Sequence, residues 1–133
     1  MPDIVINPLA VGIAAVTMFV LGGLWFGLLV AKPWQRLAGV TDEQLRTGAV
    51  RVFGGSAIVA VVIALSLSAF IGGAGAVGGL LAGVVAGLTF AAAPLIMVGL
   101  FERRPVMLLV LNAVYLVVVF AIMGLIIGAL QAG

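Results

Sequence analysis

The chain has 133 residues, of which 65% are hydrophobic and only 8% are charged, with a net charge of +2. A water-soluble domain of this length does not carry so little charge, so the composition indicates an integral membrane protein. Cysteine and histidine are absent, which removes disulfides, thiolate catalysis and the commonest metal ligand and proton shuttle. We therefore expect no enzyme activity, no cofactor, no metal site and no nucleic-acid partner.

Four long apolar segments predict four transmembrane helices. A bilayer core about 30 Å thick needs roughly 20 apolar residues per helix. Barrel strands, the other way to cross a membrane, are about 10 residues of alternating polarity, whereas these segments are apolar on every side. The predicted fold is all-α, a compact glycine-rich bundle of four transmembrane helices that forms a single domain over residues 1–133. The predicted spans are 9–30, 52–71, 77–100 and 106–130.

The positions of the basic residues predict an orientation. Short loops rich in Lys and Arg stay in the cytoplasm. All six basic residues lie in two of the predicted loops, and the other connections carry none. We therefore expect loops 31–51 and 101–105 in the cytoplasm and both termini outside, in the cytoplasmic membrane of a bacterium. The six residues are Lys32, Arg36, Arg46, Arg51, Arg103 and Arg104.

The first predicted helix has a start signal and a stop signal. Asn7 followed by Pro8 is typical of an N-cap and a first helical residue. Pro33 disfavours helix in the residue before it, so the helix is expected to end nearby. Trp25 and Trp34 lie around this end, and we interpret both as anchors in the lipid headgroup zone.

The loop at 31–51 is the only long polar stretch of the chain. Within it, Thr41 and Gln44 have the spacing of a capping box, in which each side chain bonds to the other residue's backbone amide. The pattern predicts a short interfacial helix that leads into the second span.

Glycines recur at intervals of four residues in three of the predicted spans. Lipid supplies no hydrophobic force between helices, so small residues at this spacing let two backbones approach and gain van der Waals contact. We expect one face of the third helix to be closely packed, with a partner in the same chain favoured over one in a neighbouring chain. The predicted packing glycines are Gly23, Gly27, Gly79, Gly83, Gly87, Gly124 and Gly128.

A proline inside the third span predicts a local interruption of the helix. Pro94 has no backbone N–H, so it cannot donate the hydrogen bond to the Phe90 carbonyl that a regular helix requires. We expect a kink and interpret it as structural, because neighbouring helices can satisfy the freed carbonyl. The alternative is a gating hinge.

Asn112 and Tyr115 are the most unusual residues of the fourth span. A spacing of three puts them on one helix face, and tyrosine is more common at the membrane surface than at this depth. We interpret the pair as an interhelical hydrogen-bond clasp, with the Phe90 carbonyl as a candidate partner. The alternative is a contact with a ligand or ion, for which Thr89 and Thr17 would extend a polar path.

The turn between the third and fourth spans concentrates charge in a few residues. Its motif consists of Phe101, Glu102, Arg104 and Pro105. Glu102 can pair with a basic residue of the 31–51 loop, namely Arg36, Arg46 or Arg51, and its neighbours can bind anionic lipid headgroups. By default, we interpret these charges as setting the orientation and the solubility of the protein.

Three stretches, 20–41, 100–105 and 111–128, resemble an uncharacterised bacterial membrane family known as domain of unknown function 1761. The resemblance implies a membrane fold and no established activity. Members often have histidine after the tyrosine, where this chain has Leu116, so an activity that needs an imidazole there is not implied. The residues that carry the resemblance are Gly23, Leu24, Trp25, Phe26, Lys32, Trp34, Phe101, Glu102, Arg104, Pro105, Asn112, Ala113 and Tyr115.

Two functions remain open from the sequence. The first is a non-enzymatic structural, accessory or scaffolding protein, with the lipid bilayer and a homo-oligomer or another membrane protein as partners. The second is a passive channel or small-solute transporter. The spans contain no Asp, Glu, Lys or Arg, which counts against an ion-coupled pump but leaves a passive path lined by hydroxyls and amides. A continuous polar path would favour transport, and dry glycine contacts would favour scaffolding.

Overall fold

The computed structural model describes residues 4–132 of the chain. Within that range the protein is helical without strands, and four helices are long and apolar enough to cross a membrane. The predicted fold class is therefore confirmed. The elements are α1 (Pro8–Leu24), η1 (Trp25–Leu29), α2 (Ala31–Ala38), α3 (Asp42–Arg46), α4 (Ala49–Ile71), α5 (Gly75–Ala86), η2 (Gly87–Ala92), α6 (Ala93–Phe101) and α7 (Val106–Gln131), where η denotes a π-helical segment.

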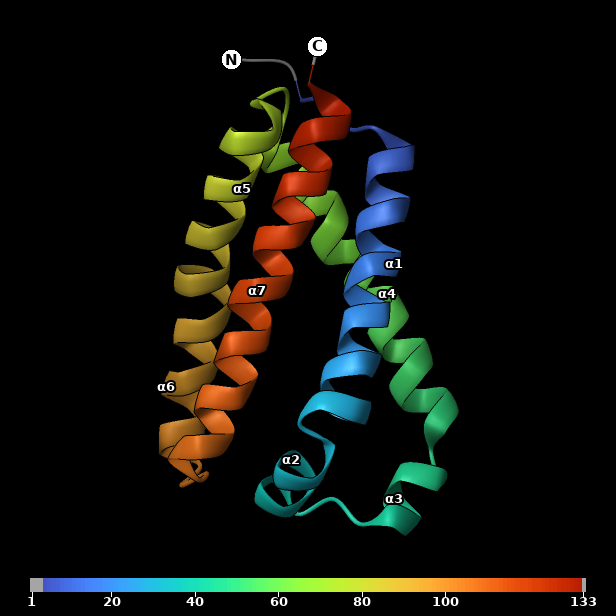
Figure 1. Cartoon of the computed structure of the whole chain (residues 1–133), viewed down its shortest axis with the longest axis vertical. Coiled ribbons are helices and arrows are strands. Elements are labelled where there is room, and N and C mark those ends of the chain that lie inside the picture. The colour runs from blue at the N-terminus through green and yellow to red at the C-terminus, as the bar shows by residue number, and fades with distance from the viewer. Residues whose placement is uncertain (1–3, 133) are drawn as a thin grey trace.

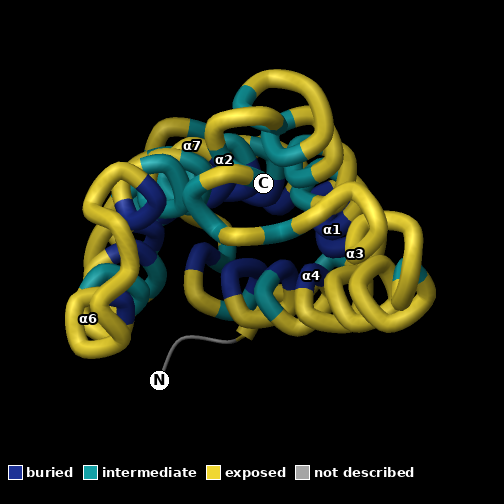
Figure 2. Tube along the Cα trace, turned by 90° about the horizontal axis from the view of Figure 1, so that it is seen from below, coloured by how far each residue is buried: buried dark blue, intermediate teal, exposed yellow. Residues whose placement is uncertain are grey.

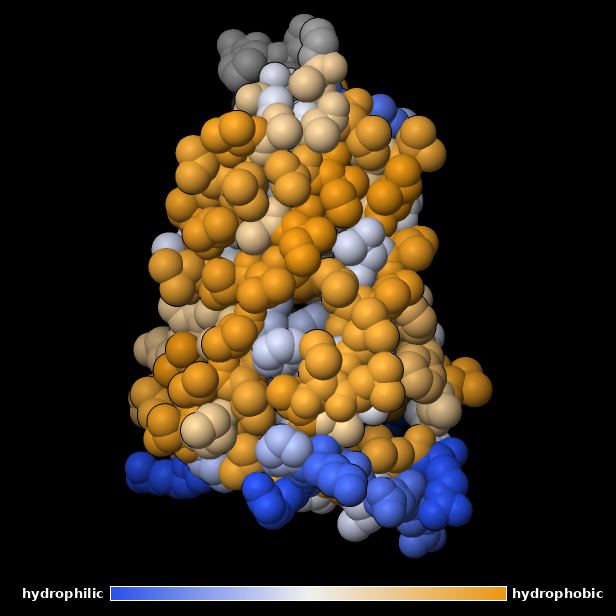
Figure 3. All heavy atoms as spheres, in the orientation of Figure 1, coloured by the Kyte–Doolittle hydropathy of each residue, from blue (hydrophilic) through white to orange (hydrophobic). Residues whose placement is uncertain are grey.

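Helix α7 lies between two partners (Figure 1). On one side it contacts the third span, formed by α5, η2 and α6, and on the other it contacts α1, which in turn packs against α4. The start of α1 and the end of α7 lie at one end of the bundle, which we call the terminal end. The loop that carries α2 and α3 and the α6–α7 turn lie at the opposite end, which we call the charged end. Hydrophilic residues form a band there, beside a broad apolar surface (Figure 3).

The start of the first helix follows the prediction. The Asn7 Oδ1 accepts hydrogen bonds from the amides of Leu9 (2.9 Å) and Ala10 (3.4 Å), and Pro8 is the first helical residue. Its end does not. Pro33 lies inside the first turn of α2, where a missing amide hydrogen costs no helix bond. The span ends before this proline, with the π-helical η1 and the non-helical Val30 (φ −122°, ψ 21°).

The predicted capping box is present in α3. The Gln44 amide donates to the Thr41 Oγ1 at 3.1 Å, and the Thr41 amide donates to the Gln44 Oε1 at 2.9 Å. The short helix does not continue into the next span, because Thr47 is extended and Gly48 has φ 70°. Since glycine takes this left-handed conformation freely, Gly48 separates α3 from α4. Helix α4 then begins at Ala49, three residues before the apolar run suggested.

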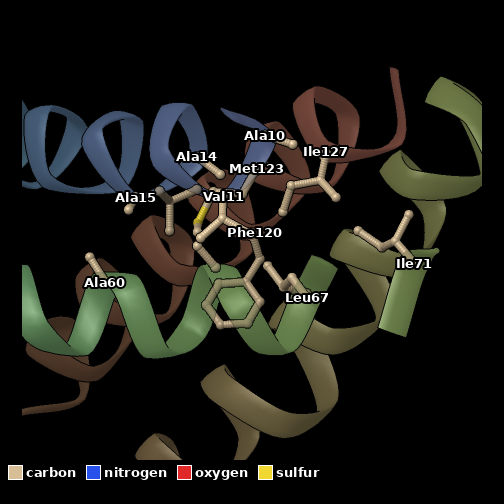
Figure 4. Close-up of a cluster of buried hydrophobic side chains, with 12 residues drawn as sticks. Ala10, Val11, Ala14, Ala15, Ala60, Leu67, Ile71, Phe120, Met123 and Ile127 are labelled. Carbon is tan, nitrogen blue, oxygen red and sulfur yellow. The ribbon is translucent and has the colours of Figure 1, made fainter. Parts of the chain in front are cut away.

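The apolar core fills the terminal half of the bundle. The buried residues of α1 lie in its first half, and those of α4 lie in its second half. Figure 2 shows buried residues on the inner sides of the helices, and Figure 4 shows the core side chains gathered together. Residues 50–59 of α4 are all exposed. The Phe53 ring lies 5.9 Å from that of Phe19 in α1, but this contact buries neither side chain. The core consists of Ala10, Val11, Ala14, Ala15, Ala60, Ala64, Leu67, Ile71, Val119, Phe120, Met123 and Ile127.

The glycines of α5 and η2 lie directly against α7. A Cβ atom on Gly83 would collide with the Phe120 carbonyl oxygen, and one on Gly87 would lie 2.9 Å from the Phe120 Cβ. Farther along, a Cβ on Gly79 would lie 2.9 Å from the Cα of Gly128 and would collide with the carbonyl oxygen of Gly124. Backbone therefore touches backbone along this contact, within one chain.

The glycine prediction is wrong for the first span. A Cβ atom on Gly23 or Gly27 would meet nothing within 4 Å, and both residues are exposed. The glycine that approaches another helix is Gly22, where a Cβ would lie 2.9 Å from the Tyr115 hydroxyl. Spacing alone does not say which side of a helix meets a partner. Here the packed side is one residue away from the glycine pair.

The third span changes helical form just before its proline. Over η2 the helix is π-helical, and the Ala93 amide donates to the Leu88 carbonyl, five residues back. Pro94 follows as one of the first residues of α6. Such single π turns place an extra residue in the helix. The interruption that Pro94 predicts is thus found as a π turn, and the span extends over Gly75–Phe101.

The turn after α6 is a Schellman motif. Arg103 has φ 61°, its amide donates to the Leu100 carbonyl, and the Arg104 amide donates to the Gly99 carbonyl at 3.0 Å. Glycine usually takes this left-handed position, and a side chain there costs about 1 kcal/mol. Pro105 follows and prevents the helix from continuing. The motif sets the tight reversal that brings α7 back beside α6.

Candidate functional site

Tyr115 links α7 to the first span. Its hydroxyl donates to the Met18 carbonyl oxygen at 3.0 Å, and its ring lies 5.1 Å from that of Phe26 and 6.3 Å from that of Trp25. Because Gly22 has no side chain, the hydroxyl can approach the α1 backbone. The geometry is that of an interhelical clasp. The bond goes to Met18 and not to the Phe90 carbonyl that the sequence suggested.

We expect Tyr115→Phe to lower the stability of the bundle only slightly, by about 1 kcal/mol or less. The hydrogen bond to Met18 is lost, but the ring contacts remain, and single interhelical hydrogen bonds in membranes contribute about this much. Thermal unfolding in detergent measures the change. Tyr115→Ala is the comparison, because it also removes the ring and should cost clearly more. Equal losses for the two variants would mean that the ring packing contributes little.

Asn112 lies one helical turn before Tyr115 and lacks a partner for its amide oxygen. Within residues 4–132, the buried side-chain polar atoms without a hydrogen bond are Asn112 Oδ1 and Trp25 Nε1. A buried polar atom without a partner costs about 1–3 kcal/mol. The clasp predicted for the pair is therefore made by Tyr115, while Asn112 has an open acceptor.

A pocket of about 570 Å³ adjoins Asn112 at the charged end. Helix α2, the end of the third span, the 102–105 turn and the start of α7 form its walls. Most of the lining side chains are apolar, and charge is present only where the turn contributes. The pocket is lined by Trp34, Ala38, Ala91, Pro94, Leu95, Val98, Gly99, Glu102, Arg104, Leu108, Leu109 and Asn112.

The two threonines proposed to extend a polar path do not do so. The Thr89 hydroxyl donates to the Val85 carbonyl of its own helix at 2.6 Å, and Thr89 is exposed. The Thr17 hydroxyl donates to Ile13 in the same way at 2.7 Å. Threonines in apolar helices commonly satisfy themselves like this. Thr89 is not among the residues that line the pocket beside Asn112, so the predicted cluster of three is reduced to Asn112 and Tyr115.

The members of the turn motif have different surroundings. Glu102 and Arg104 line the pocket, whereas the Phe101 side chain is 79% exposed and points away from the bundle. Pro105 is the N-cap residue of α7. The motif therefore combines a structural role, the reversal of the chain, with two charged side chains beside an apolar pocket.

The two tryptophans also differ from one another. The Trp25 Nε1 is buried, so this indole does not offer its N–H to lipid headgroups. Its ring packs on Tyr115 instead, and the interpretation of Trp25 as an anchor is wrong. Trp34 lies in α2, with its ring 5.0 Å from that of Phe26, and it lines the pocket. Its role as an interface anchor stays a prediction.

A second polar cluster, which the sequence analysis missed, ties three helices together at the terminal end. Gln131 is 7% exposed and Ser68 is fully buried. The Gln131 Nε2 donates to the carbonyls of Ser68 (3.1 Å) and Gly72 (2.9 Å). Its Oε1 accepts from the Asn7 amide at 3.0 Å and from the Ser68 hydroxyl. The signal was available, since a polar side chain inside an apolar helix needs a partner, but the partner is 63 residues away in the sequence.

Four apolar helices with charged residues gathered at one end define a small polytopic membrane protein. The chain belongs to the family described as protein of unknown function (DUF1761), whose pattern it matches over residues 9–128. No curated protein and no solved structure shows a match to the chain. The family membership confirms the resemblance seen in the sequence.

Proposed function

We propose that the protein is a non-enzymatic accessory or scaffolding component of the bacterial cytoplasmic membrane. The observation that carries this proposal is the close packing of α7. Its terminal half contacts glycine backbone of α5 on one side and buried residues of α1 and α4 on the other. The Gln131 cluster closes the same end. A protein built in this way is suited to hold helices in place.

The alternative, a passive channel or small-solute transporter, has less support. The hydroxyls of Thr17 and Thr89 are engaged within their own helices, so they add no polar surface to a path. Beyond Tyr115, the positions toward the terminal end of α7 include the fully buried Val119 and Met123. The α7 residues that line the pocket beside Asn112 all precede these two buried positions, so the pocket has no polar continuation along this part of α7.

Flux measurements separate the two functions. We expect liposomes that contain the purified protein to lose K⁺ and to take up glycerol no faster than protein-free liposomes. Gln131→Ala liposomes test whether the terminal cluster acts as a plug. A flux above that of the protein-free control, in the wild type or in this variant, would support the channel alternative and contradict the scaffold.

A scaffold needs a partner, and we expect the partner to bind at the exposed first half of α4. Residues 50–59 are all exposed, although the Phe53 ring lies 5.9 Å from that of Phe19 in α1, and Ile58 is 68% exposed. We expect a photo-crosslinker at Ile58 to give one discrete product in native membranes, with the mass of a second copy or of another membrane protein. The control position is Val77 of α5, which is 71% exposed on a helix whose other face is already packed. Lipid adducts alone at Ile58 would contradict the proposal.

The proposed orientation places the charged end in the cytoplasm, because the six basic residues lie there. The chain has no cysteine, so single cysteines report accessibility cleanly. In intact bacterial spheroplasts, an impermeant maleimide should label Ala132→Cys at once and Thr47→Cys only after the membrane is permeabilised. The reverse pattern would mean that the termini lie inside.

A further inference from the structure

The two short helices of the charged end differ in charge. Helix α2 contains Lys32 and Arg36, which we call the basic pair, and no acidic residue. Helix α3 contains Asp42 and Glu43 as well as Arg46. Both helices lie at the charged end, where hydrophilic residues form a band (Figures 1 and 3). Of these two helices, α2 therefore carries the net positive charge.

The basic pair lies on the outer side of α2. Lys32 and Arg36 are four residues apart, a spacing that puts two side chains on one side of a helix, and both are exposed. The opposite side of the helix consists of the partly buried Trp34, Leu37 and Ala38. Two like charges at this spacing repel one another. An anion bound between them relieves that repulsion.

The described chain does not neutralise the basic pair itself. Asp42 is the acidic residue nearest to it in the sequence, and its Oδ1 accepts a hydrogen bond from Gln35 Nε2 at 2.8 Å. Within residues 4–132, no acidic side chain forms an ion pair with Lys32 or Arg36. The two cations are therefore available to an anion outside the chain.

Packing fixes the depth of α2 relative to the bilayer. The first span ends at Leu29, and α2 begins at Ala31. The Trp34 ring lies 5.0 Å from that of Phe26 in η1, and α2 also contacts α7, so α2 stays against the end of the span. Each headgroup layer of a bilayer is about 5–7 Å thick and begins where the hydrocarbon ends. The basic pair thus lies at the level of the lipid phosphates.

We propose that the basic pair of α2 binds the headgroup of an anionic phospholipid in the leaflet at the charged end. Lys32 and Arg36 donate charge-assisted hydrogen bonds to the phosphate oxygens, and the negative charge offsets the repulsion between them. In a zwitterionic phospholipid the ammonium group cancels the charge of the phosphate, so such a lipid binds more weakly. This binding site is separate from the accessory role proposed above, and it holds whether or not a protein partner exists.

Lipid titration followed by native mass spectrometry in detergent tests the proposal. Dioleoyl phosphatidylglycerol and dioleoyl phosphatidylcholine have the same chains and differ in headgroup charge. We expect the first molecule of phosphatidylglycerol to bind about ten-fold more tightly, because each basic residue near a membrane surface favours anionic lipid several-fold. Dioleoyl phosphatidic acid should bind at least as tightly as phosphatidylglycerol, since both carry an anionic phosphate. Binding of phosphatidic acid no tighter than that of phosphatidylcholine would contradict the proposal.

Two matched double variants locate the site. Lys32→Gln combined with Arg36→Gln should reduce the preference for phosphatidylglycerol to about two-fold or less. Arg46→Gln combined with Arg51→Gln removes two positive charges from α3 and the start of α4, and should leave the preference within about two-fold of the wild type. All four side chains are exposed, and circular dichroism establishes that each variant is folded.

Two results would overturn the proposal. Equal loss of preference in the two double variants would mean that the total charge of this end, and not α2, attracts the lipid. Equal binding of phosphatidylglycerol and phosphatidylcholine to the wild type would mean that the basic pair does not select an anion. Neither result affects the crosslinking and flux tests of the accessory role.

Discussion

Replacing Gly83 by leucine should destabilise the bundle more than any other single change considered, by at least about 3 kcal/mol. A Cβ there would collide with the Phe120 carbonyl oxygen and lie 3.1 Å from the Ala121 Cα. Backbone atoms cannot rotate away as a side chain can, so α5 and α7 must separate. Overpacking a tight contact costs about 1–3 kcal/mol and occasionally more. Thermal unfolding in detergent, followed by circular dichroism, measures the loss.

Two controls isolate the clash. Gly23→Ala adds a methyl group where nothing lies within 4 Å, and alanine is the better helix former, so its stability should be unchanged or slightly higher. Leu81→Ala removes a side chain of α5 that is 61% exposed and should have a small effect. If Gly83→Leu and Leu81→Ala lowered stability equally, the glycine contact would not hold the two helices together.

Replacing Gln131 by leucine should have the second largest effect, roughly 2–3 kcal/mol. The change leaves the Ser68 hydroxyl, two carbonyls and the Asn7 amide without their partner. Single interhelical hydrogen bonds in membranes average about 0.6 kcal/mol, but Gln131 makes several at once and is 7% exposed. Leucine has a similar size to glutamine, so the loss of stability reflects the missing hydrogen bonds more than a change in packing.

The control for this prediction is a second serine of α4, the helix that contains Ser68. Ser66 is exposed, and its hydroxyl donates to the Val62 carbonyl of its own helix at 2.9 Å, so Ser66→Ala should be nearly neutral. Ser68→Ala should cost less than Gln131→Leu, and the double variant should cost less than the sum because the two share a bond. Additive losses would show that Ser68 and Gln131 do not act together.

The spans and their start signals were predictable because each is encoded locally. Apolar runs of sufficient length can only be helices in a bilayer, and the caps at Asn7 and Thr41 involve neighbours within three residues. The spacing of Gly79, Gly83 and Gly87 marked a contact face. Spacing could not say that Gly22 meets α7 and that Gly23 does not, since that depends on how α1 is rotated in the bundle.

The candidate site was less predictable for the same reason. Asn112 and Tyr115 share a helix face, yet one finds a partner on α1 and the other does not, a difference that the fourth span alone does not contain. The pocket depends on α2, which folds back so that Trp34 lies near the start of α7. Thr89 looked equivalent to the other polar residues because its bond to its own helix cannot be distinguished from a free hydroxyl in the sequence.

The placement of the core in one half of the bundle has a consequence for how the protein opens. Local opening begins where few side chains are buried. In α4 the exposed stretch of residues 50–59 precedes the core positions from Ala60 to Ile71. Amide hydrogens in the first half of α4 should therefore exchange with solvent deuterium before those near Ser68. The terminal end acts as the last part of the molecule to come apart, and the charged end can rearrange without unfolding it.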